Sequence, residues 1–282
     1  MELDIIFKPS TKTQNDENFP VTTRFIPAAF RRHIHLFYNC VRSADDIADS
    51  ASLTSKQKSF LLKQIDDVLK GTEKSNENTE FAFQHRQSAD ETGVTIEHAR
   101  HLLQAFMMDV TKSRYRNWSE LINYCHYSAA PVGRYLLDLH GCDKNSQKGT
   151  DSLCIALQIL NHLQDCKMDY MALNRVYIPE EFFKAHKTDV TILEANNTDI
   201  NFRRVLDTIL TRTDELIYIA REETWKISHR GLRFQTGIII AIAENLSKAL
   251  RQRDPISERV ELTKRQYAFC FLKGFWRVLV RA

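Results

Sequence analysis

The chain has 282 residues, 43% of them hydrophobic and 27% charged, as in ordinary folded proteins rather than disordered or fibrous ones. The formal net charge is +3 and the two signs are interspersed, so no nucleic-acid partner is expected. Glycine and proline, 8 and 6 residues, make up about 5% of the chain against roughly 12% in average proteins, which disfavours turn-rich β folds and Gly-rich phosphate loops and favours long helices.

Apolar residues recur at spacings of three and four between the polar segments of the chain, a periodicity that predicts helices from end to end. No internal repeat is present, and no linker is long enough to separate two domains. The sequence therefore predicts one all-α domain over residues 1–282, with residues 1–18 flexible. Helices are expected at 27–50, 56–70, 79–90, 95–112, 118–140, 150–172, 200–229, 231–252 and 257–280.

The six cysteines form no CxxC pair, and five of them lie in apolar segments with helical spacing. This pattern indicates free thiols in a reducing compartment rather than a disulfide framework. The first residues are too acidic for a signal peptide, and no apolar run reaches the roughly 20 residues of a membrane span. A cytoplasmic protein is therefore expected.

The segment RSADDIAD at 42–49 places carboxylates on one face of the first predicted helix. Asp45 and Asp49 are four residues apart, which is about 40° around the helix axis and roughly 6 Å along it. Like charges at this spacing repel, and a bound divalent cation is the simplest way to offset that repulsion. Mg²⁺ is the candidate, because it prefers one or two carboxylates together with water and phosphate oxygens. Taken alone, the segment is equally consistent with a solvated acidic patch.

The same spacing recurs at Asp165 and Asp169, with Asn161 one turn earlier. Two carboxylate faces opposed across a helical cavity can hold Mg²⁺ ions that bind a diphosphate and stabilise its departure as a leaving group. Arg175 follows shortly after and can neutralise a phosphate oxygen through its planar fork. The alternative for Arg175 is a surface arginine near a helix end.

These motifs resemble those of the squalene and phytoene synthases, a family of head-to-head isoprenoid synthases. The resemblance covers about residues 17–180 and rests on DDIAD at 45–49, NHLQDCKMD at 161–169, NRVYIP at 174–179, a tyrosine-rich segment at 109–125, and ENFP at 17–20 leading into FIP at 25–27. It implies an isoprenoid synthase fold, with helices around a central active-site cavity.

Individual roles follow from the same resemblance. The implied Mg²⁺ ligands are Asp45, Asp46, Asp49, Asp165 and Asp169. Diphosphate contacts are implied for Tyr38, Arg42, Asn161 and Arg175. Tyr124 matches a family tyrosine near the reacting centre, where it either orients a water molecule or steadies a carbocation. Aromatic walls around such a cation are also expected, although ordinary core packing is the alternative for each candidate, including Tyr115.

The segment SAAPVGR at 128–134 departs from the family pattern, which usually reads V-A-G-x-V-G. Ala129, Val132 and Gly133 still put small residues on one face, where a bulky isoprenoid chain can approach the helix. Pro131 either kinks a continuous helix or marks the break between two shorter ones. This segment and the ENFPV start resemble the hopanoid-pathway branch of the family, the hydroxysqualene synthases.

That branch implies Mg²⁺-dependent conversion of presqualene diphosphate and water to hydroxysqualene and diphosphate, with no NADPH. Two alternatives stay open. One is the condensation of two prenyl diphosphates, such as farnesyl diphosphate, to presqualene diphosphate, squalene or phytoene. The other is a non-catalytic family member that acts as an assembly protein, although retention of the four spaced aspartates favours an enzyme. Other enzymes of the pathway are candidate partners.

The apolar segment 267–280, flanked by basic residues, has two interpretations. It is either an interfacial helix that gives peripheral contact with the inner membrane face or a terminal helix that caps the core.

Overall fold

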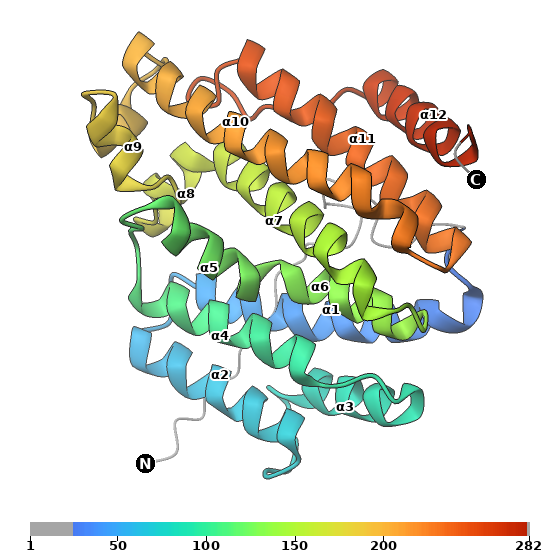
Figure 1. The fold of residues 1–282 in the computed structure, drawn as a ribbon. Coiled ribbons are helices and arrows are strands. Elements are labelled where there is room, and N and C mark those ends of the chain that lie inside the picture. Colours follow the sequence, from blue (N-terminus) through green and yellow to red (C-terminus); the bar gives the residue numbers. More distant parts are fainter. Residues whose placement is uncertain (1–24, 281–282) are drawn as a thin grey trace. The chain divides into compact units, whose positions relative to one another are not determined.

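The computed structural model describes residues 25–280, whose regular secondary structure is helical (Figure 1). Within this range, extended backbone pairs at one point alone, a parallel bridge between Arg114 and Val176. The predicted all-α class is therefore confirmed. The chain forms two compact units that divide between Lys112 and Ser113. A single domain stays a prediction, and residues 1–18 and the ENFP motif lie outside the described residues.

Unit 1 contains four helices within the described residues. They are α1 (Ala28–Asp49), α2 (Ser55–Lys70), α3 (Glu80–Thr92) and α4 (Glu97–Thr111), and each agrees with its predicted range to within two residues. α1 packs against the other three helices. Ile34, Phe37 and Ile47 are among its buried residues, because spacings of three and four put side chains on one side of a helix.

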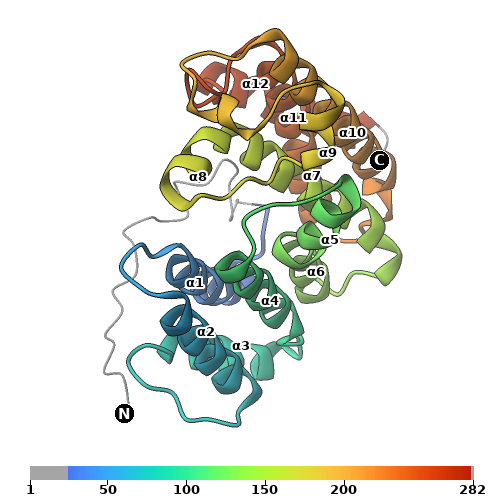
Figure 2. The same cartoon turned by 90° about the vertical axis from the view of Figure 1, so that its left-hand side faces the viewer.

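Unit 2 contains the remaining α-helices of the described chain. They are α5 (Trp118–Ser128), α6 (Ala130–Leu139), α7 (Gln147–Gln164), α8 (Cys166–Leu173), α9 (Glu180–Ala185), α10 (Ile200–Glu223), α11 (Arg230–Gln252) and α12 (Lys264–Val280). α7 is the central helix of this unit, because it packs against α5, α6, α10 and α11 (Figures 1 and 2). These four helices hold α7 in place, and the second aspartate motif begins in its last turn.

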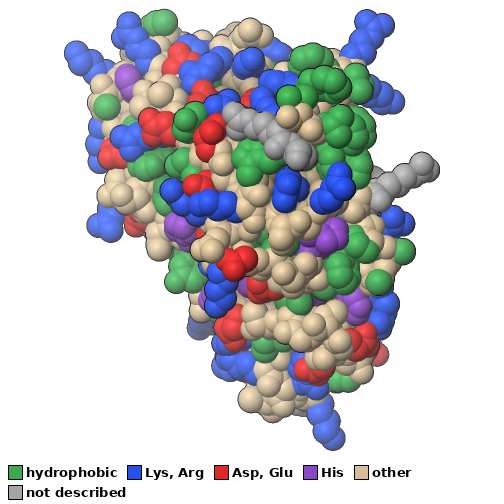
Figure 3. Space-filling view, turned by 45° about the vertical axis from the view of Figure 1, so that its right-hand side comes forward, with side chains coloured by type: hydrophobic (Ala, Val, Ile, Leu, Met, Phe, Trp, Pro, Cys, Tyr) green, Lys and Arg blue, Asp and Glu red, His purple; other side chains and the backbone are tan. Residues whose placement is uncertain are grey.

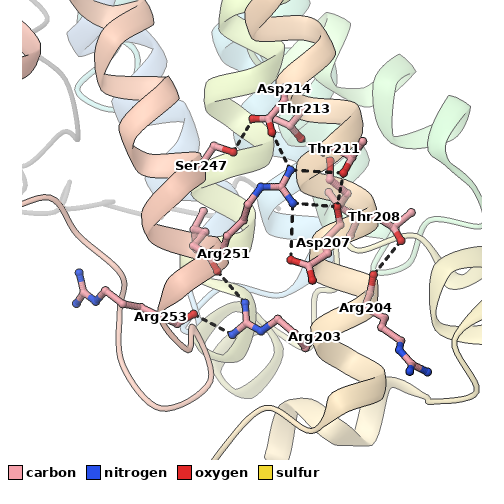
Figure 4. A network of polar contacts seen from close by, with 12 residues as sticks. Arg203, Arg204, Asp207, Thr208, Thr211, Thr213, Asp214, Ser247, Arg251 and Arg253 are labelled. Carbon is pink, nitrogen blue, oxygen red and sulfur yellow. Dashed lines mark hydrogen bonds and ion pairs between the residues drawn. The ribbon is translucent and has the colours of Figure 1, made fainter.

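A polar network joins α10 to α11 (Figure 4). Arg251 of α11 donates to the carboxylate of Asp214 on α10 at 2.7 Å. In the opposite direction, Arg203 of α10 donates to the carbonyl oxygens of Leu250 at 2.8 Å and Arg253 at 2.9 Å. These bonds satisfy carbonyl groups that the end of a helix leaves without an intrahelical partner. The loop that follows α11 is consequently anchored at its first residue.

Two of the long predicted helices are each broken into two. The range 118–140 breaks at Ala129, and Pro131 lies in the first turn of α6, where its missing N–H costs no helical bond. Of the two interpretations of Pro131, the break between shorter helices is therefore correct. The range 150–172 breaks at Asp165, whose φ and ψ of −102° and 8° depart from helical values.

The last helix begins at Lys264 rather than at residue 257. Thr263 and Gln266 form a capping box there, since the Gln266 side chain accepts from the Thr263 N–H at 2.8 Å and the Thr263 hydroxyl accepts from the Gln266 N–H at 3.3 Å. The six cysteines are all free, as predicted. Across residues 25–280, every helix falls short of the length and apolarity that crossing a membrane requires.

Candidate active site

One side of α1 carries the first aspartate motif together with two further predicted site residues. Spacings of four, three and four align Tyr38, Arg42, Asp45 and Asp49 along the helix. The Arg42 guanidinium donates hydrogen bonds to two carboxylates. Its Nη1 donates to Asp45 Oδ2 at 3.0 Å, and its Nη2 donates to Asp46 Oδ1 at 2.7 Å. The guanidinium predicted to contact diphosphate is therefore held in place by the motif itself.

Asp45 lies in a concentration of negative charge. The pKa of this carboxyl is raised to about 8, chiefly by burial and next by the charge of Asp49, while the Arg42 guanidinium acts in the opposite direction. Asp109 and Asp46 add smaller effects that also raise the pKa. Asp109 comes from α4 and is buried, so two helices of unit 1 supply these acids. Carboxylates that resist ionisation in this way favour a bound cation, which removes their mutual repulsion.

The second motif keeps its helical spacing although the helix breaks in its middle. The N–H of Asp165 donates to the carbonyl of Asn161 at 3.0 Å, and the N–H of Asp169 donates to the carbonyl of Asp165 at 2.8 Å. Asp165 ends α7 and precedes α8, and Asp169 lies in the first turn of α8. The prediction of one continuous helix was wrong here, but the two carboxylates are still one turn apart along the backbone.

Arg175 is buried, with 7% of its surface exposed, so the interpretation as a surface arginine is wrong. The backbone N–H of Arg175 donates to the backbone carbonyl of Asp169 at 3.1 Å, so the chain at Arg175 is held next to the second motif. Next to it, the pKa of His162 is lowered to about 3, chiefly by burial and in smaller part by the positive charge of Arg175. His162 is consequently neutral, and its Nδ1 lies 3.9 Å from the Asp169 carboxylate.

Four rings form what we name the aromatic cluster of unit 2: Tyr115, Tyr124, His162 and Tyr177. His162 stacks on Tyr177 with ring centroids 3.5 Å apart and planes 13° apart. Tyr124 lies 5.3 Å from Tyr115 and 5.4 Å from Tyr177 between centroids. Tyr115, Tyr124 and Tyr177 are 1%, 3% and 8% exposed, so the cluster is buried, and it lies beside the second motif through His162.

A short pairing of extended backbone assembles this cluster. Asn174 ends α8 in the left-handed conformation, with φ of 51°, and Arg114 donates to its side-chain oxygen at 2.7 Å. The chain then runs beside the segment before α5, where the N–H of Val176 donates to Ser113 at 2.9 Å and that of Glu180 donates to Tyr115 at 2.8 Å. Tyr115 and Tyr177 become neighbours because of this pairing.

Arg259 was not predicted, yet it contacts the second motif directly. Its Nε donates to Asp165 Oδ1 at 2.6 Å and its Nη2 donates to Asp165 Oδ2 at 3.2 Å, the two-point geometry that suits guanidinium and carboxylate. Gln164 holds the same loop, because its side-chain amide donates to the carbonyl of Val260 at 2.5 Å. No local sequence signal marks Arg259. Gln164, His162 and Tyr177, by contrast, stand within the motifs that carried the family resemblance.

The residues predicted to receive the isoprenoid chain lie around the junction of α5 and α6. Ala129 is the junction itself and is buried, and Val132 is half-buried in the first turn of α6. Gly133 faces α7, where an added Cβ would lie 2.3 Å from Thr150 Cγ2. This glycine therefore permits close packing of α6 on α7, and its contact with substrate stays a prediction.

The donor atoms of both motifs suit Mg²⁺, which favours carboxylate oxygens and completes its shell with water and phosphate oxygens. A metal site made by protein side chains alone would need at least three ligands close together. Within residues 25–280, no three side chains of His, Cys, Asp or Glu form such a group. Asp45, Asp46 and Asp49 lie in unit 1, and Asp165 and Asp169 lie in unit 2.

The protein belongs to the squalene/phytoene synthase family, whose sequence model matches residues 12–266. The hydroxysqualene synthase of Rhodopseudomonas palustris is 39% identical over 272 residues, which cover 96% of this chain and 92% of that protein. The crystal structure of a squalene synthase from Alicyclobacillus acidocaldarius matches with a TM-score of 0.71 and 26% identity, covering 85% of this chain and 90% of that one. A dehydrosqualene synthase in complex with ligand shares the fold, with a TM-score of 0.81 at 16% identity, over 95% and 93% of the two chains.

Proposed function

We propose that the protein is a Mg²⁺-dependent hydroxysqualene synthase, which converts presqualene diphosphate and water to hydroxysqualene and diphosphate. The observation that carries this choice is the 39% identity to the Rhodopseudomonas palustris enzyme over nearly the full length of both chains. The charged side chains and the aromatic cluster described above support the proposal, because the reaction needs positive charge at its leaving group and aromatic side chains around a cation. The reaction consumes no hydride, so no NADPH is expected.

Departure of the diphosphate needs neutralisation of negative charge at the leaving group. Mg²⁺ bound at each aspartate motif would supply most of that positive charge. The chain adds its own: Arg42 is already oriented by Asp45 and Asp46, and Arg175 is buried next to the second motif. Tyr38 lies one turn before Arg42, and Asn161 lies one turn before Asp165. Both side chains would donate to phosphate oxygens.

The carbocation left behind needs aromatic walls and the exclusion of bulk water. The aromatic cluster of Tyr115, Tyr124, His162 and Tyr177 supplies such a wall in unit 2. Because His162 is neutral, it places no positive charge beside the cation. Tyr124 is the member that we assign to the reacting centre, where one admitted water molecule attacks the cation, forms the C–O bond and releases a proton.

A second candidate is the condensation of two farnesyl diphosphates, since the fold is shared with a squalene synthase and the same aspartates serve either reaction. A non-catalytic assembly role is the third candidate, and the retained carboxylates count against it. We place the enzyme in the cytoplasm, at the inner face of the membrane, where other enzymes of the pathway would supply its substrate.

Product analysis tests the proposal. Purified protein is incubated with Mg²⁺, without NADPH, separately with presqualene diphosphate and with farnesyl diphosphate. We expect hydroxysqualene from the first substrate and no turnover of the second. Consumption of farnesyl diphosphate alone would instead establish the condensation reaction, and inactivity on both substrates would favour the assembly role.

A further inference from the structure

The C-terminal helix concentrates exposed hydrophobic side chains. Eleven large hydrophobic side chains are exposed among the described residues, and six of them belong to the 17 residues of α12. Leu272 and Trp276 are each 66% exposed, and Phe269 is 58% exposed. Together with Leu279 and Val280 they follow spacings of three and four, so they share one side of the helix, which we name the outer face of α12.

The inner side of α12 is packed on α11. Cys270, Gly274 and Val278, each four residues from the next, are its buried residues. The two backbones approach closely at a pair of glycines, where a Cβ added to Gly274 would lie 2.5 Å from the carbonyl oxygen of Gly237. The helix therefore caps the core of unit 2, as one sequence interpretation held, while its outer face points away from that core.

The charge of α12 is entirely positive. It carries four basic residues and no acidic one. Lys273 and Arg277 pair with Glu244 of α11 at 2.7 and 2.9 Å, which fixes the rotation of the helix. Lys264 and Arg265 are exposed at its beginning. In Figure 3, hydrophobic side chains gather toward the upper right, the side that holds α12 in Figure 1, with basic side chains around them.

We propose that the outer face of α12 binds the surface of an anionic phospholipid bilayer, with the helix lying in the plane of the interface. Its apolar side chains enter the boundary between head groups and acyl chains, and Lys264 and Arg265 contact lipid phosphates. A second copy of the chain fits less well, because a two-fold pairing of outer faces brings like charges together. The inference rests on the proposed function, since presqualene diphosphate and its product carry long apolar chains that partition into bilayers.

Vesicle flotation of the full chain tests this inference. The vesicles are phosphatidylcholine alone, or phosphatidylcholine mixed with phosphatidylglycerol. We expect binding to the mixed vesicles, and binding at least about fivefold weaker without the anionic lipid. The double variant Leu272→Gln/Trp276→Gln should bind the mixed vesicles at least about tenfold more weakly, because it lacks two large apolar side chains that would move from water into the bilayer. Its circular dichroism should match that of the wild type, because the inner side is unchanged.

Ile200→Gln is the matched control. Ile200 is 67% exposed on α10, so this variant removes a similar hydrophobic side chain and should leave vesicle binding unchanged. The double variant should also retain wild-type turnover of presqualene diphosphate dissolved in detergent, which separates membrane binding from catalysis. Undiminished flotation of the double variant overturns the inference, as does a wild-type dimer in light scattering that the double variant dissociates. Failure of the wild type to turn over this substrate would defeat the proposed function while leaving the surface intact.

Discussion

Both aspartate motifs hold guanidinium groups against their carboxylates. Arg42 pairs with Asp45 and Asp46, and Arg259 pairs with Asp165. Each arginine offsets negative charge that the helical spacing has concentrated. A metal ion that coordinates the same oxygens must share them with the arginine or replace it. The affinity of each motif for a cation therefore depends on the arginine as well as on the aspartates.

Replacing Asp165 tests the second motif. We expect Asp165→Asn to lower turnover of presqualene diphosphate at least about 100-fold, because an amide neither carries the negative charge nor binds Mg²⁺ as strongly. Asp151→Asn is the control, since Asp151 lies on the same helix and pairs with Arg134 at 2.6 Å. Steady-state kinetics and thermal melting of both variants give the answer. Near-normal turnover by Asp165→Asn would remove this aspartate from the mechanism.

Replacing Arg259 tests its competition with metal. In Arg259→Ala the carboxylate of Asp165 loses its two-point partner, so the substrate-free protein should bind Mg²⁺ more tightly, by up to about fivefold, as expected for a partly exposed pair worth ~0.2–1 kcal/mol. Isothermal titration with Mg²⁺ measures this. Arg253→Ala is the matched control, because Arg253 lies in the same loop and donates to Glu258 at 2.8 Å instead. Unchanged or weaker binding by Arg259→Ala would show that this arginine does not compete with the metal.

At the scale of helices, periodicity predicts where a helix exists better than where it is interrupted. The four helices described in residues 25–112 of unit 1 lie within two residues of their predicted ranges, because spacings of three and four persist along each. The breaks at Ala129 and Asp165 keep that spacing on both sides, so periodicity alone does not reveal them. Pro131 was a local signal for the first break. Asp165 offers no such signal for the second break, because aspartate occurs within helices as well as at breaks between them.

The contact between α11 and α12 depends on two glycines and predicts a large effect for one substitution. Gly274→Val should destabilise the protein by about 1–3 kcal/mol, because its Cβ meets backbone atoms of Gly237 and Ile238 at 2.5 Å, which cannot rotate away. Urea denaturation measures the loss, and limited proteolysis should show early cleavage in α12. Ala268→Val, on an exposed position of the same helix, is the control. Equal stability of the two variants would mean that the helices are not in close backbone contact.

At the scale of the whole molecule, contacts between distant residues limit what the sequence predicts. The aspartates, Asn161 and Tyr124 were predicted because they stand in motifs, and each motif is local. Arg259 and Asp165 are 94 residues apart, and their meeting depends on how the loop after α11 returns to α7. The pairing of segments 113–116 and 175–181, which makes Tyr115 and Tyr177 neighbours, is equally invisible to helical periodicity.

The stability of the whole protein should depend on one buried histidine of unit 1. His85 is fully buried on α3, with its ring edge-on to Phe37 at 5.3 Å between centroids. The pKa of His85 is lowered to about 4, chiefly by burial and in smaller part by the charge of His98. In the unfolded chain a histidine has a pKa of about 6.5, so the unfolded state binds more protons between about pH 4 and 6.5. The stability from neutral His85 is complete above this window and is lost as the pH falls through it.

His85→Gln removes this titration while keeping a neutral polar side chain of similar size. Between about pH 7 and pH 5, the wild type should lose ~2 kcal/mol more of its free energy of unfolding than the variant does. Comparing the two proteins isolates His85, because all other titrating groups, including Asp45 with its raised pKa, are common to both. Urea denaturation at the two pH values measures the difference, and His126→Gln, exposed on α5, should behave as the wild type. Equal pH dependence of the wild type and His85→Gln would contradict the prediction, because it would mean that His85 gains its proton as readily in the folded protein as in the unfolded one.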